Sequence, residues 1–264
     1  MPSRGDLLAL AYAAVAVAAV ALFGFTPASV GIPATLLLAV LADGIARPGS
    51  GVLYPTVTHG PRSGRKVALS FDDGPDPEVT PAVLDALARY GARATFFGIG
   101  RALQAHPALA RRIASDCHEL GNHSWTHSRW QNFFGARRQA EEIERGARAV
   151  AQVTGAATQP LYRPPIGLKS PPLARAARRL RLTLVAWSLH SHDTRGGDPR
   201  RIAQRVLDRI RPGDIVLMHD GHDLHGRHRP TGARALPHIL EGLRQKGLQC
   251  VTVSELLDVT GPAA

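Results

Sequence analysis

From residue 65 onward, short apolar runs alternate with amphipathic stretches. Seven apolar runs have the length of strands, at 67–71, 94–99, 119–123, 161–163, 183–189, 215–219 and 248–253. Amphipathic stretches separate them, at 77–90, 101–115, 135–153, 171–182, 199–210 and 231–246. Strands that alternate with helices indicate an α/β fold with a parallel sheet. Because no glycine-rich phosphate loop follows the first run, we expect a barrel rather than a dinucleotide-binding open sheet.

The chain begins with a long uncharged segment. No charged residue lies between Asp6 and Asp43, and residues 7–25 are almost entirely Leu, Ala and Val, which is enough to span a bilayer. A Gly-Phe-Thr-Pro break at 24–27 precedes a second apolar run at 34–42. We therefore expect a membrane segment over 1–47, with one or two short transmembrane helices, and favour a hairpin of two. The alternatives are one anchor with an interfacial stretch, or a cleaved signal peptide.

Basic residues flank this segment on both sides, with Arg4 before it and Arg47, Arg62, Arg65 and Lys66 after it. By the positive-inside rule, a hairpin would keep the rest of the chain in the cytoplasm, whereas a single span would export it. We expect anchoring in the inner (cytoplasmic) membrane of a bacterium. The side occupied by the domain stays open, and we favour the extracytoplasmic one.

The remaining chain divides by composition. Residues 48–64 are rich in Gly, Pro and Ser and predict a linker, followed by a catalytic domain over 65–258 and a tail over 259–264. Two cysteines, Cys117 and Cys250, are too few for a disulfide framework or a cysteine zinc site. We expect both to be buried, small apolar residues, with a single disulfide between them as the alternative.

The chain is strongly basic, with 32 Lys and Arg against 21 Asp and Glu and a formal net charge of +11. Such a balance suits either an anionic partner or a solvated, arginine-rich surface, and we favour the surface. Aromatic residues make up only 5% and do not interleave with basic runs, so the stacking platform of a single-strand nucleic-acid binder is absent. We expect no nucleic-acid partner.

Polar side chains suited to chemistry follow the ends of the apolar runs. Asp72 and Asp73 follow the first run, His123 closes the third and His127 lies beyond it, Arg163 closes the fourth, Asp193 lies just past the fifth and His219 closes the sixth. In a β/α barrel these strand ends meet on one face, where such folds carry their active sites. We therefore expect these seven residues to converge.

Two of these groups together suggest a metal site. The adjacent carboxylates of Asp72 and Asp73 repel each other, and a divalent metal on one would leave the other free as a base. His123 and His127, four residues apart, would lie on the same side of a helical turn. Asp73, His123 and His127 form an ordinary catalytic zinc set with a position left for water. The structural alternatives are a plain Asp-capped turn and an incidental histidine pair.

Two further motifs suggest catalytic groups. The Pro-Pro turn after Arg163 fixes the Ile166 N–H, which could face an oxyanion, while Arg163 could pair with a carboxylate. His219, near Asp193, could act as a general acid. The alternatives are a plain turn and a satisfied core histidine. The histidines beyond it predict a polar loop rather than a second metal site, at His222, His225 and His228.

Five motifs in order make residues 65–257 similar to the polysaccharide deacetylases, the NodB-homology enzymes of carbohydrate esterase family 4. They are Phe71-Asp72-Asp73-Gly74-Pro75, His123-Ser124-x-x-His127, Arg163-Pro164-Pro165-x-Gly167, Trp187 with Asp193, and Leu217-Met218-His219-Asp220. The resemblance implies a distorted (β/α)7 barrel. It also implies a metal-dependent hydrolase that removes N-acetyl groups from the amino sugars of a polysaccharide, either peptidoglycan or a chitin-like polymer.

The resemblance also implies roles for individual residues. The metal ligands would be Asp73, His123 and His127, holding a divalent ion that we expect to be Zn²⁺. Asp72 would be the base, His219 the acid, Arg163 the partner of the base and Asp193 the residue that orients the acid; Ile166, Pro165 and Trp187 would serve the oxyanion and the substrate. Three positions depart from the family pattern: Ile166 in place of Tyr, Thr194 in place of an aromatic residue and Cys117 in place of Gly.

Two other functions fit the same sequence. A deacetylase or deformylase of a membrane lipid-linked amino sugar keeps the fold and the chemistry, and a cytoplasmic domain would favour it. A non-catalytic barrel that binds carbohydrate would be expected to have lost a metal ligand or the base, yet those positions are filled. In the catalytic readings the partners are an N-acetylated glycan and the membrane.

Overall fold

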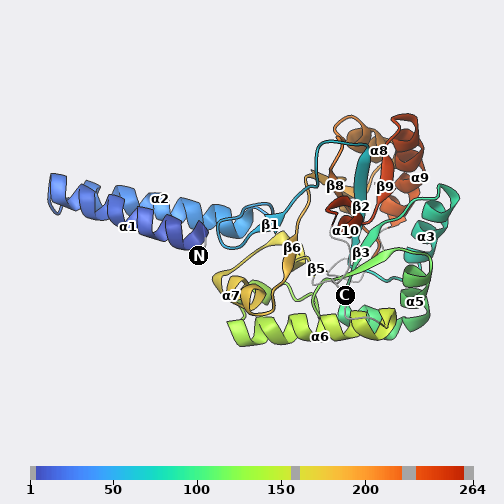
Figure 1. Ribbon diagram of the computed structural model, residues 1–264, viewed down its shortest axis with the longest axis horizontal. Coiled ribbons are helices and arrows are strands. Elements are labelled where there is room, and N and C mark those ends of the chain that lie inside the picture. The colour runs from blue at the N-terminus through green and yellow to red at the C-terminus, as the bar shows by residue number, and fades with distance from the viewer. Residues whose placement is uncertain (1–3, 156–160, 222–229, 259–264) are drawn as a thin grey trace.

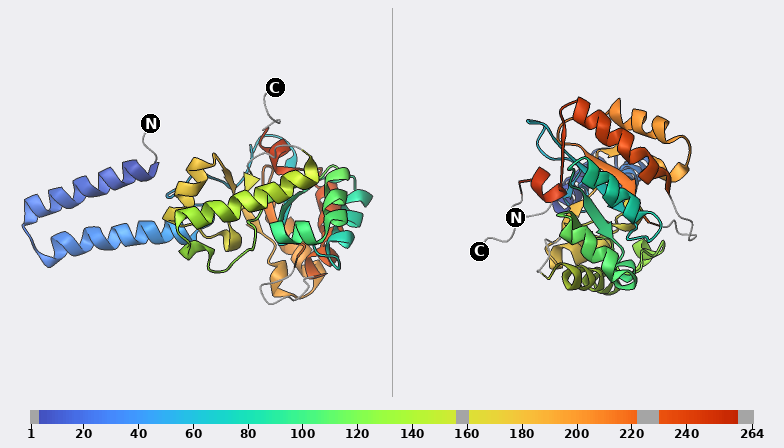
Figure 2. Two further views of the ribbon diagram at one scale, coloured as in Figure 1. Left: turned by 90° about the horizontal axis from the view of Figure 1, so that it is seen from below. Right: turned by 90° about the vertical axis from the view of Figure 1, so that its right-hand side faces the viewer.

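The computed structural model describes residues 4–155, 161–221 and 230–258. It consists of a helical hairpin that extends from an α/β domain (Figure 1). The hairpin pairs α1 (Arg4–Phe23) with α2 (Pro27–Ala46), which run side by side (Figure 2). At the break, Thr26 and Ser29 cap the start of α2 through reciprocal hydrogen bonds. The predicted pair of apolar helices separated at 24–27 is thus present.

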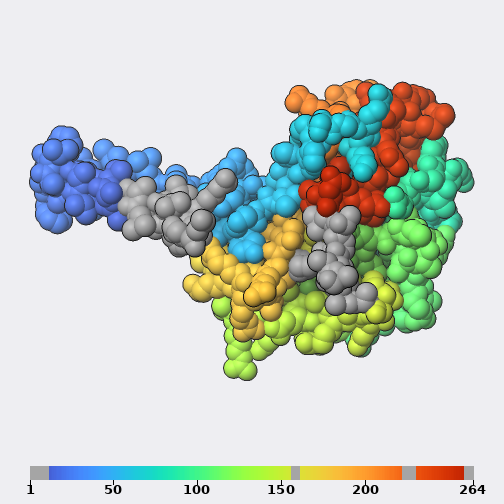
Figure 3. Space-filling model, in the orientation of Figure 1, coloured from blue at the N-terminus to red at the C-terminus, as the bar shows by residue number. Residues whose placement is uncertain are grey.

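By length and composition, α2 could cross a membrane. Among the residues whose side chains the structure describes, α1 adds a shorter apolar helix over Tyr12–Phe23. The described side chains of the hairpin expose large apolar groups, among them Leu22, Phe25, Ile32 and Leu38. The space-filling view shows the hairpin projecting from the domain rather than covering it (Figure 3). An exposed apolar surface of this extent is typical of a membrane or protein contact.

The domain contains a nine-stranded parallel sheet in the order β1-β6-β5-β4-β3-β2-β8-β7, with β9 also paired to β2. The strands are β1 (Thr56–Val57), β2 (Lys66–Asp72), β3 (Thr95–Gly98), β4 (Glu119–Asn122), β5 (Leu161–Tyr162), β6 (Thr183–Val185), β7 (Leu189–His190), β8 (Ile215–His219) and β9 (Gln249–Val251). The sheet curves into an open, distorted barrel, which confirms the predicted fold class.

Helices connect the strands and cover the sheet (Figure 1). They are α3 (Thr80–Arg89), α4 (Gly100–Ala105), α5 (Pro107–Ser115), α6 (Ala136–Thr154), α7 (Pro171–Arg179), α8 (Pro199–Leu207), α9 (Pro230–Gln245) and α10 (Val253–Leu256). Their apolar faces pack on β2, which is buried from Val67 to Asp72, and Phe71 stacks on Phe96 with ring centroids 5.1 Å apart. This core fixes the direction in which the carboxyl end of β2 points.

Three details differ from the sequence prediction. The helix expected at 101–115 is divided into α4 and α5, because Pro107 lacks an N–H and restricts His106 before it. The strand expected at 183–189 is divided into β6, which pairs with β5, and β7, which pairs with β8. The segment predicted as a linker contributes β1, which pairs with β6.

The cysteine prediction was half right. Cys250 is buried, but Cys117 is exposed, and neither forms a disulfide. Cys117 adopts a left-handed backbone with φ 61° in the turn between α5 and β4, which carries its side chain to the surface.

The hairpin is tied to the loop that follows β5. The buried Lys169 donates from Nζ to the carbonyl oxygens of Arg47 and Pro48, at 3.0 and 2.5 Å, and from its backbone N–H to Ile45 O. These carbonyls lie at the carboxyl end of α2, where unpaired oxygens favour a cation. The base of the hairpin is therefore bound to Lys169, which follows Ile166 by three residues in the chain.

Candidate active site

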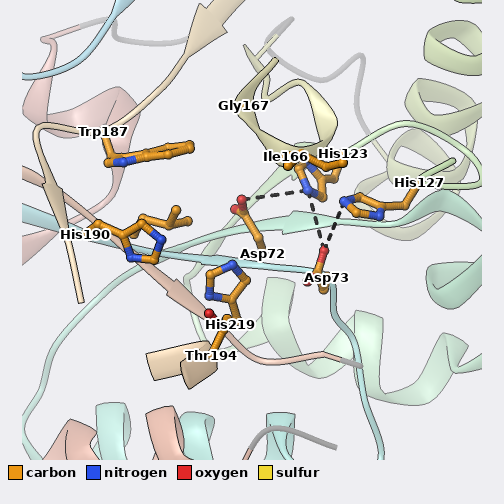
Figure 4. A pocket seen from close by; sticks show the side chains of 11 residues that line it. Asp72, Asp73, His123, His127, Ile166, Gly167, Trp187, His190, Thr194 and His219 are labelled. Atoms are coloured by element: carbon orange, nitrogen blue, oxygen red, sulfur yellow. Dashed lines mark ion pairs between the residues drawn. The ribbon is translucent and has the colours of Figure 1, made fainter. Parts of the chain in front are cut away.

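The carboxyl ends of the strands enclose a cavity of about 240 Å³ (Figure 4). It is lined by Asp72, Asp73, His123, His127, Ile166, Gly167, Trp187, His190, Thr194, Leu217 and His219. The predicted site residues whose polar or aromatic side chains line this cavity are Asp72, Asp73, His123, His127, Trp187 and His219. Arg163 and Asp193 do not line it, but they hydrogen-bond to Asp72 and His219, respectively. Pro165 is buried and is not among the described residues that line it.

Arg163 holds Asp72 in the floor of the pocket. Its guanidinium is fully buried and donates from Nη1 to Asp72 Oδ1 at 2.6 Å, and from Nε and Nη2 to the carbonyls of Val185 and Ala186. The cation also lies 4.0 Å from the centroid of Phe97. Burial alone would raise the pKa of Asp72, but Arg163 and the nearby histidines keep that pKa below its usual value. Asp72 is therefore a carboxylate at neutral pH.

Asp73, His123 and His127 bring three ligand atoms within 4.8 Å of one another. Asp73 Oδ1 lies 3.6 Å from His123 Nε2 and 3.3 Å from His127 Nε2. His123 Nδ1 is 2.8 Å from the carbonyl oxygen of Arg163, which fixes Nδ1 as the protonated nitrogen and leaves the Nε2 lone pair facing Asp73. Two imidazoles and one carboxylate, all buried or nearly so, are a donor set that fits a divalent metal.

The expectation that His123 and His127 lie on one side of a helical turn was wrong. They belong to the loop after β4, in which Ser124 and His127 have left-handed backbones with φ of 67° and 53°. Ser124 Oγ accepts a hydrogen bond from the His127 N–H, which closes the loop. This turn, rather than helical spacing, brings the rings to a centroid distance of 4.8 Å.

His219 is oriented by Asp193 as predicted from their proximity. Nδ1 of His219 lies 2.9 Å from Asp193 Oδ1, and the His219 N–H donates to Asp193 Oδ2. Ser191 Oγ donates to the same carboxylate. Burial lowers the pKa of His219, but Asp193 outweighs it and raises that pKa to about 9. In the sheet, His219 is the register partner of Asp72, so the carboxylate and the imidazole are neighbours.

Strained backbone is concentrated at this site. Several non-glycine residues with positive φ lie in or beside the pocket: Asp73, Ser124, His127, Ile166 and His192. Such conformations cost of order 1–3 kcal/mol each and persist where the surroundings enforce them. The Ile166 side chain lines the cavity and is half exposed, and the adjacent Gly167 is packed between Trp187 and Pro48.

Sequence reasoning missed His190 and did not predict how Thr194 would be used. His190 ends β7, lines the cavity and stacks on His192 with centroids 4.3 Å apart; its ring centroid lies 6.0 Å from that of His219. Burial lowers the pKa of His190 to about 4, so it is a neutral imidazole. Thr194 lines the cavity where the family pattern has an aromatic residue. The sequence signal for His190 was its position directly after the predicted strand at 183–189, where other site residues also lie. His222, His225 and His228 lie outside the described residues.

A parallel barrel with a metal-competent triad, an arginine-paired carboxylate and an aspartate-paired histidine defines a class of hydrolytic site, and comparison with known proteins identifies the family. The polysaccharide deacetylase model matches residues 59–185. A peptidoglycan-N-acetylglucosamine deacetylase from Bacillus cereus is 36% identical over 200 residues, which are 75% of this chain and 90% of that protein. A chitooligosaccharide deacetylase from Azorhizobium caulinodans is 32% identical, over 69% of this chain and 89% of that protein. The chain belongs to the polysaccharide deacetylase family.

Solved structures agree with this assignment. A crystal structure of a peptidoglycan N-acetylglucosamine deacetylase in complex with 4-naphthalen-1-yl-N-oxidanyl-benzamide is 29% identical, with a TM-score of 0.72 over 79% of this chain and 95% of that one. A family pseudoenzyme from Bacillus anthracis is 25% identical, with a TM-score of 0.69 over 77% of this chain and 69% of that one. The fold therefore occurs in both active and inactive members, and activity has to be argued from the site.

Proposed function

We propose that this protein is a metal-dependent N-deacetylase of amino sugars in a glycan, either peptidoglycan or a chitin-like polymer. The observation that carries the proposal is the convergence of three pairings in one pocket. These are the buried Asp72–Arg163 pair, the Asp73 set with its two histidines, and the Asp193–His219 pair. A barrel that only binds carbohydrate has no need of a buried base beside an acid.

The residues divide the reaction between them. Asp72, kept ionised by Arg163, accepts the proton of the attacking water. A divalent metal held by Asp73, His123 and His127, for which we propose Zn²⁺, supplies Lewis-acid activation when bound. The Ile166 N–H assists at the amide oxygen as negative charge develops there. His219, protonated because of Asp193, gives its proton to the departing nitrogen, and acetate and a free amine result.

The neighbours of the pocket are proposed to position the sugar. Trp187 offers an aromatic wall with its ring 5.9 Å from His190, and Pro165 rigidifies the turn that carries Ile166. Thr194 offers no aromatic ring to the sugar, and we propose that the neutral imidazole of His190, which lines the same cavity, supplies part of that contact surface.

We propose that the α1–α2 hairpin anchors the protein in the cytoplasmic membrane of a bacterium. One contact favours a second candidate substrate, a lipid-linked amino sugar. Pro48, two residues beyond α2, packs on Gly167 in the pocket wall. A pocket next to the base of a membrane hairpin lies near the bilayer surface, where lipid-linked sugars are found.

Metal content and turnover test the proposal separately. Purified protein should carry about one equivalent of divalent metal. His123→Ala should lose it, because the variant lacks one of three donors, the one whose ring is held by the Arg163 carbonyl oxygen. Acetate release from N-acetylglucosamine oligomers should stop on chelation and return on adding Zn²⁺. Acetate release that is indifferent to chelation would refute the metal-dependent reaction.

A further inference from the structure

A second cavity adjoins the candidate active site. Its volume is about 560 Å³, within the roughly 300–1,000 Å³ typical of ligand sites. Asp73 and His127 line both cavities. In Figure 4 these two residues lie on the opposite side of the pocket from Trp187 and His190. The second cavity therefore continues the substrate pocket beyond the metal-ligand set.

Arginines from three elements converge on this cavity. Arg101 lies on α4, Arg129 on the loop after β4 and Arg138 on α6, and all three are exposed. Within the described part of the chain, none of them pairs with a carboxylate, whereas the neighbouring Arg137 pairs with Glu141. Guanidinium groups bind carboxylates and phosphates through paired, charge-assisted hydrogen bonds. The three cations are available for an anionic ligand.

Two carboxylates also line the cavity, and both are engaged by the chain itself. Glu142 is buried, and its Oε2 accepts hydrogen bonds from the N–H and the hydroxyl of Thr126 at 2.9 and 2.8 Å. Asp73 faces His123 and His127, as described above. Because Glu142 is satisfied by Thr126 and Asp73 belongs to the proposed metal-ligand set, the exposed arginines give the rest of the cavity its cationic character.

An exposed aromatic ring completes the lining. Trp130 is 62% exposed and lines the cavity, with its ring centroid 5.9 Å from that of Phe133. The guanidinium carbon of Arg138 lies 3.7 Å from the ring centroid of Phe134, a cation–π contact that restrains this side chain. Aromatic surface beside a few convergent charged groups is typical of a site that orients a ligand. A sugar with an acidic substituent offers both kinds of contact.

We propose that Arg101, Arg129 and Arg138 bind an anionic substituent of the glycan, next to the sugar that is deacetylated. This inference rests on the proposed deacetylase function and adds to it a preference for acidic glycans over neutral ones. The carboxylate of a neighbouring muramic acid and the phosphate of a lipid carrier share this chemistry. A neutral chitooligosaccharide lacks it.

The test compares substrates on the full-length protein in detergent micelles. The substrates are a neutral N-acetylglucosamine oligomer, an oligomer that alternates with N-acetylmuramic acid, the same oligomer with its carboxylates converted to methyl esters, and a lipid diphosphate-linked sugar. The test variant combines Arg101→Gln, Arg129→Gln and Arg138→Gln, and Arg137→Gln is the matched control outside the cavity. Binding is also measured by calorimetry on an Asp72→Asn background.

For the preferred anionic substrate, the triple variant should raise KM and weaken binding by at least about tenfold, the scale of a lost charge-assisted hydrogen bond. The kcat of the triple variant on the anionic substrate should change by less than about twofold, and so should its kcat and KM on the neutral oligomer. Arg137→Gln should behave as wild type. The muramic acid and lipid arms identify which anion is bound.

The inference would be overturned if the triple variant lost the same affinity for neutral and anionic substrates. It would also be overturned if the wild type bound the acid and its methyl ester equally well and showed no preference for the lipid diphosphate. Absence of acetate release from every substrate would instead overturn the proposed function. The calorimetric comparison still decides the anion site in that case, because it needs no turnover.

Discussion

At the scale of single residues, the site depends on opposite pKa shifts in two neighbouring groups. Asp72 and His219 are register partners on adjacent strands, and each has a buried, oppositely charged companion behind it. Arg163 lowers the pKa of the carboxyl, and Asp193 raises that of the imidazole. Between the two pKa values Asp72 is deprotonated and His219 is protonated, which is the state that the proposed hydrolysis requires of its base and its acid.

Replacing Asp193 should shift the pH dependence of turnover. In the proposed mechanism protonated His219 is the active form, so the wild-type rate should fall as the pH rises through its pKa of about 9. Asp193→Asn removes the negative charge that raises this pKa, so the alkaline limb should move to lower pH. A pH profile of kcat checks this. An unchanged alkaline limb in Asp193→Asn would show that another group controls it.

At the scale of elements, Arg163 joins the ends of three strands. It follows β5, pairs with Asp72 at the end of β2 and donates to carbonyls at and beyond the end of β6. A fully buried cation with donors to three partners closes this part of the barrel. Removing it leaves the buried Asp72 carboxylate without its guanidinium partner and takes one donor from each of the two carbonyls.

Arg163→Ala should therefore lower the free energy of unfolding by about 3–5 kcal/mol, the usual cost of breaking a buried ion pair from one side. The matched control is Arg179→Ala on α7, whose arginine is 66% exposed and pairs with Glu144; it should cost at most about 1 kcal/mol. Urea titrations of both variants measure the difference. Similar midpoints for the two variants would contradict the structural role of Arg163.

Much of this arrangement was predictable from the pattern of strands and helices. The runs that end just before Asp72 and at His123, Arg163 and His219 predicted parallel strands, and parallel strands bring such ends together. The division of the run over 183–189 was not predictable, because only sheet pairing decides that Leu189 joins β8. The turn that brings His127 to Asp73 depends on left-handed residues that are not glycine, and local propensity disfavours these.

At the scale of the whole molecule, the hairpin and the pocket are mechanically connected. Lys169, which follows Ile166 by three residues in the chain, hydrogen-bonds to the carboxyl end of α2. Pro48 packs on Gly167. An anchored hairpin would therefore hold the pocket at a set distance from the bilayer rather than at the end of a loose tether.

The full-length chain should sediment with membranes and resist carbonate extraction, because 7–42 is uncharged and the described side chains of α2 expose apolar surface. Its amino terminus should remain intact. Sequencing of the amino terminus from the membrane fraction and protease protection of the domain provide the measurements. A soluble protein that begins beyond Ala46 would identify the segment as a cleaved signal instead.

The most direct test of deacetylation compares wild type with Asp72→Asn on N-acetylglucosamine oligomers and on peptidoglycan glycan strands, with Zn²⁺ present. We predict acetate release by the wild type, and a rate at least about 10²-fold lower for the variant, the usual loss on removing a general base. The variant should retain its bound metal, since Asp72 is not one of the three proposed ligands. Wild-type turnover in Asp72→Asn would contradict the account.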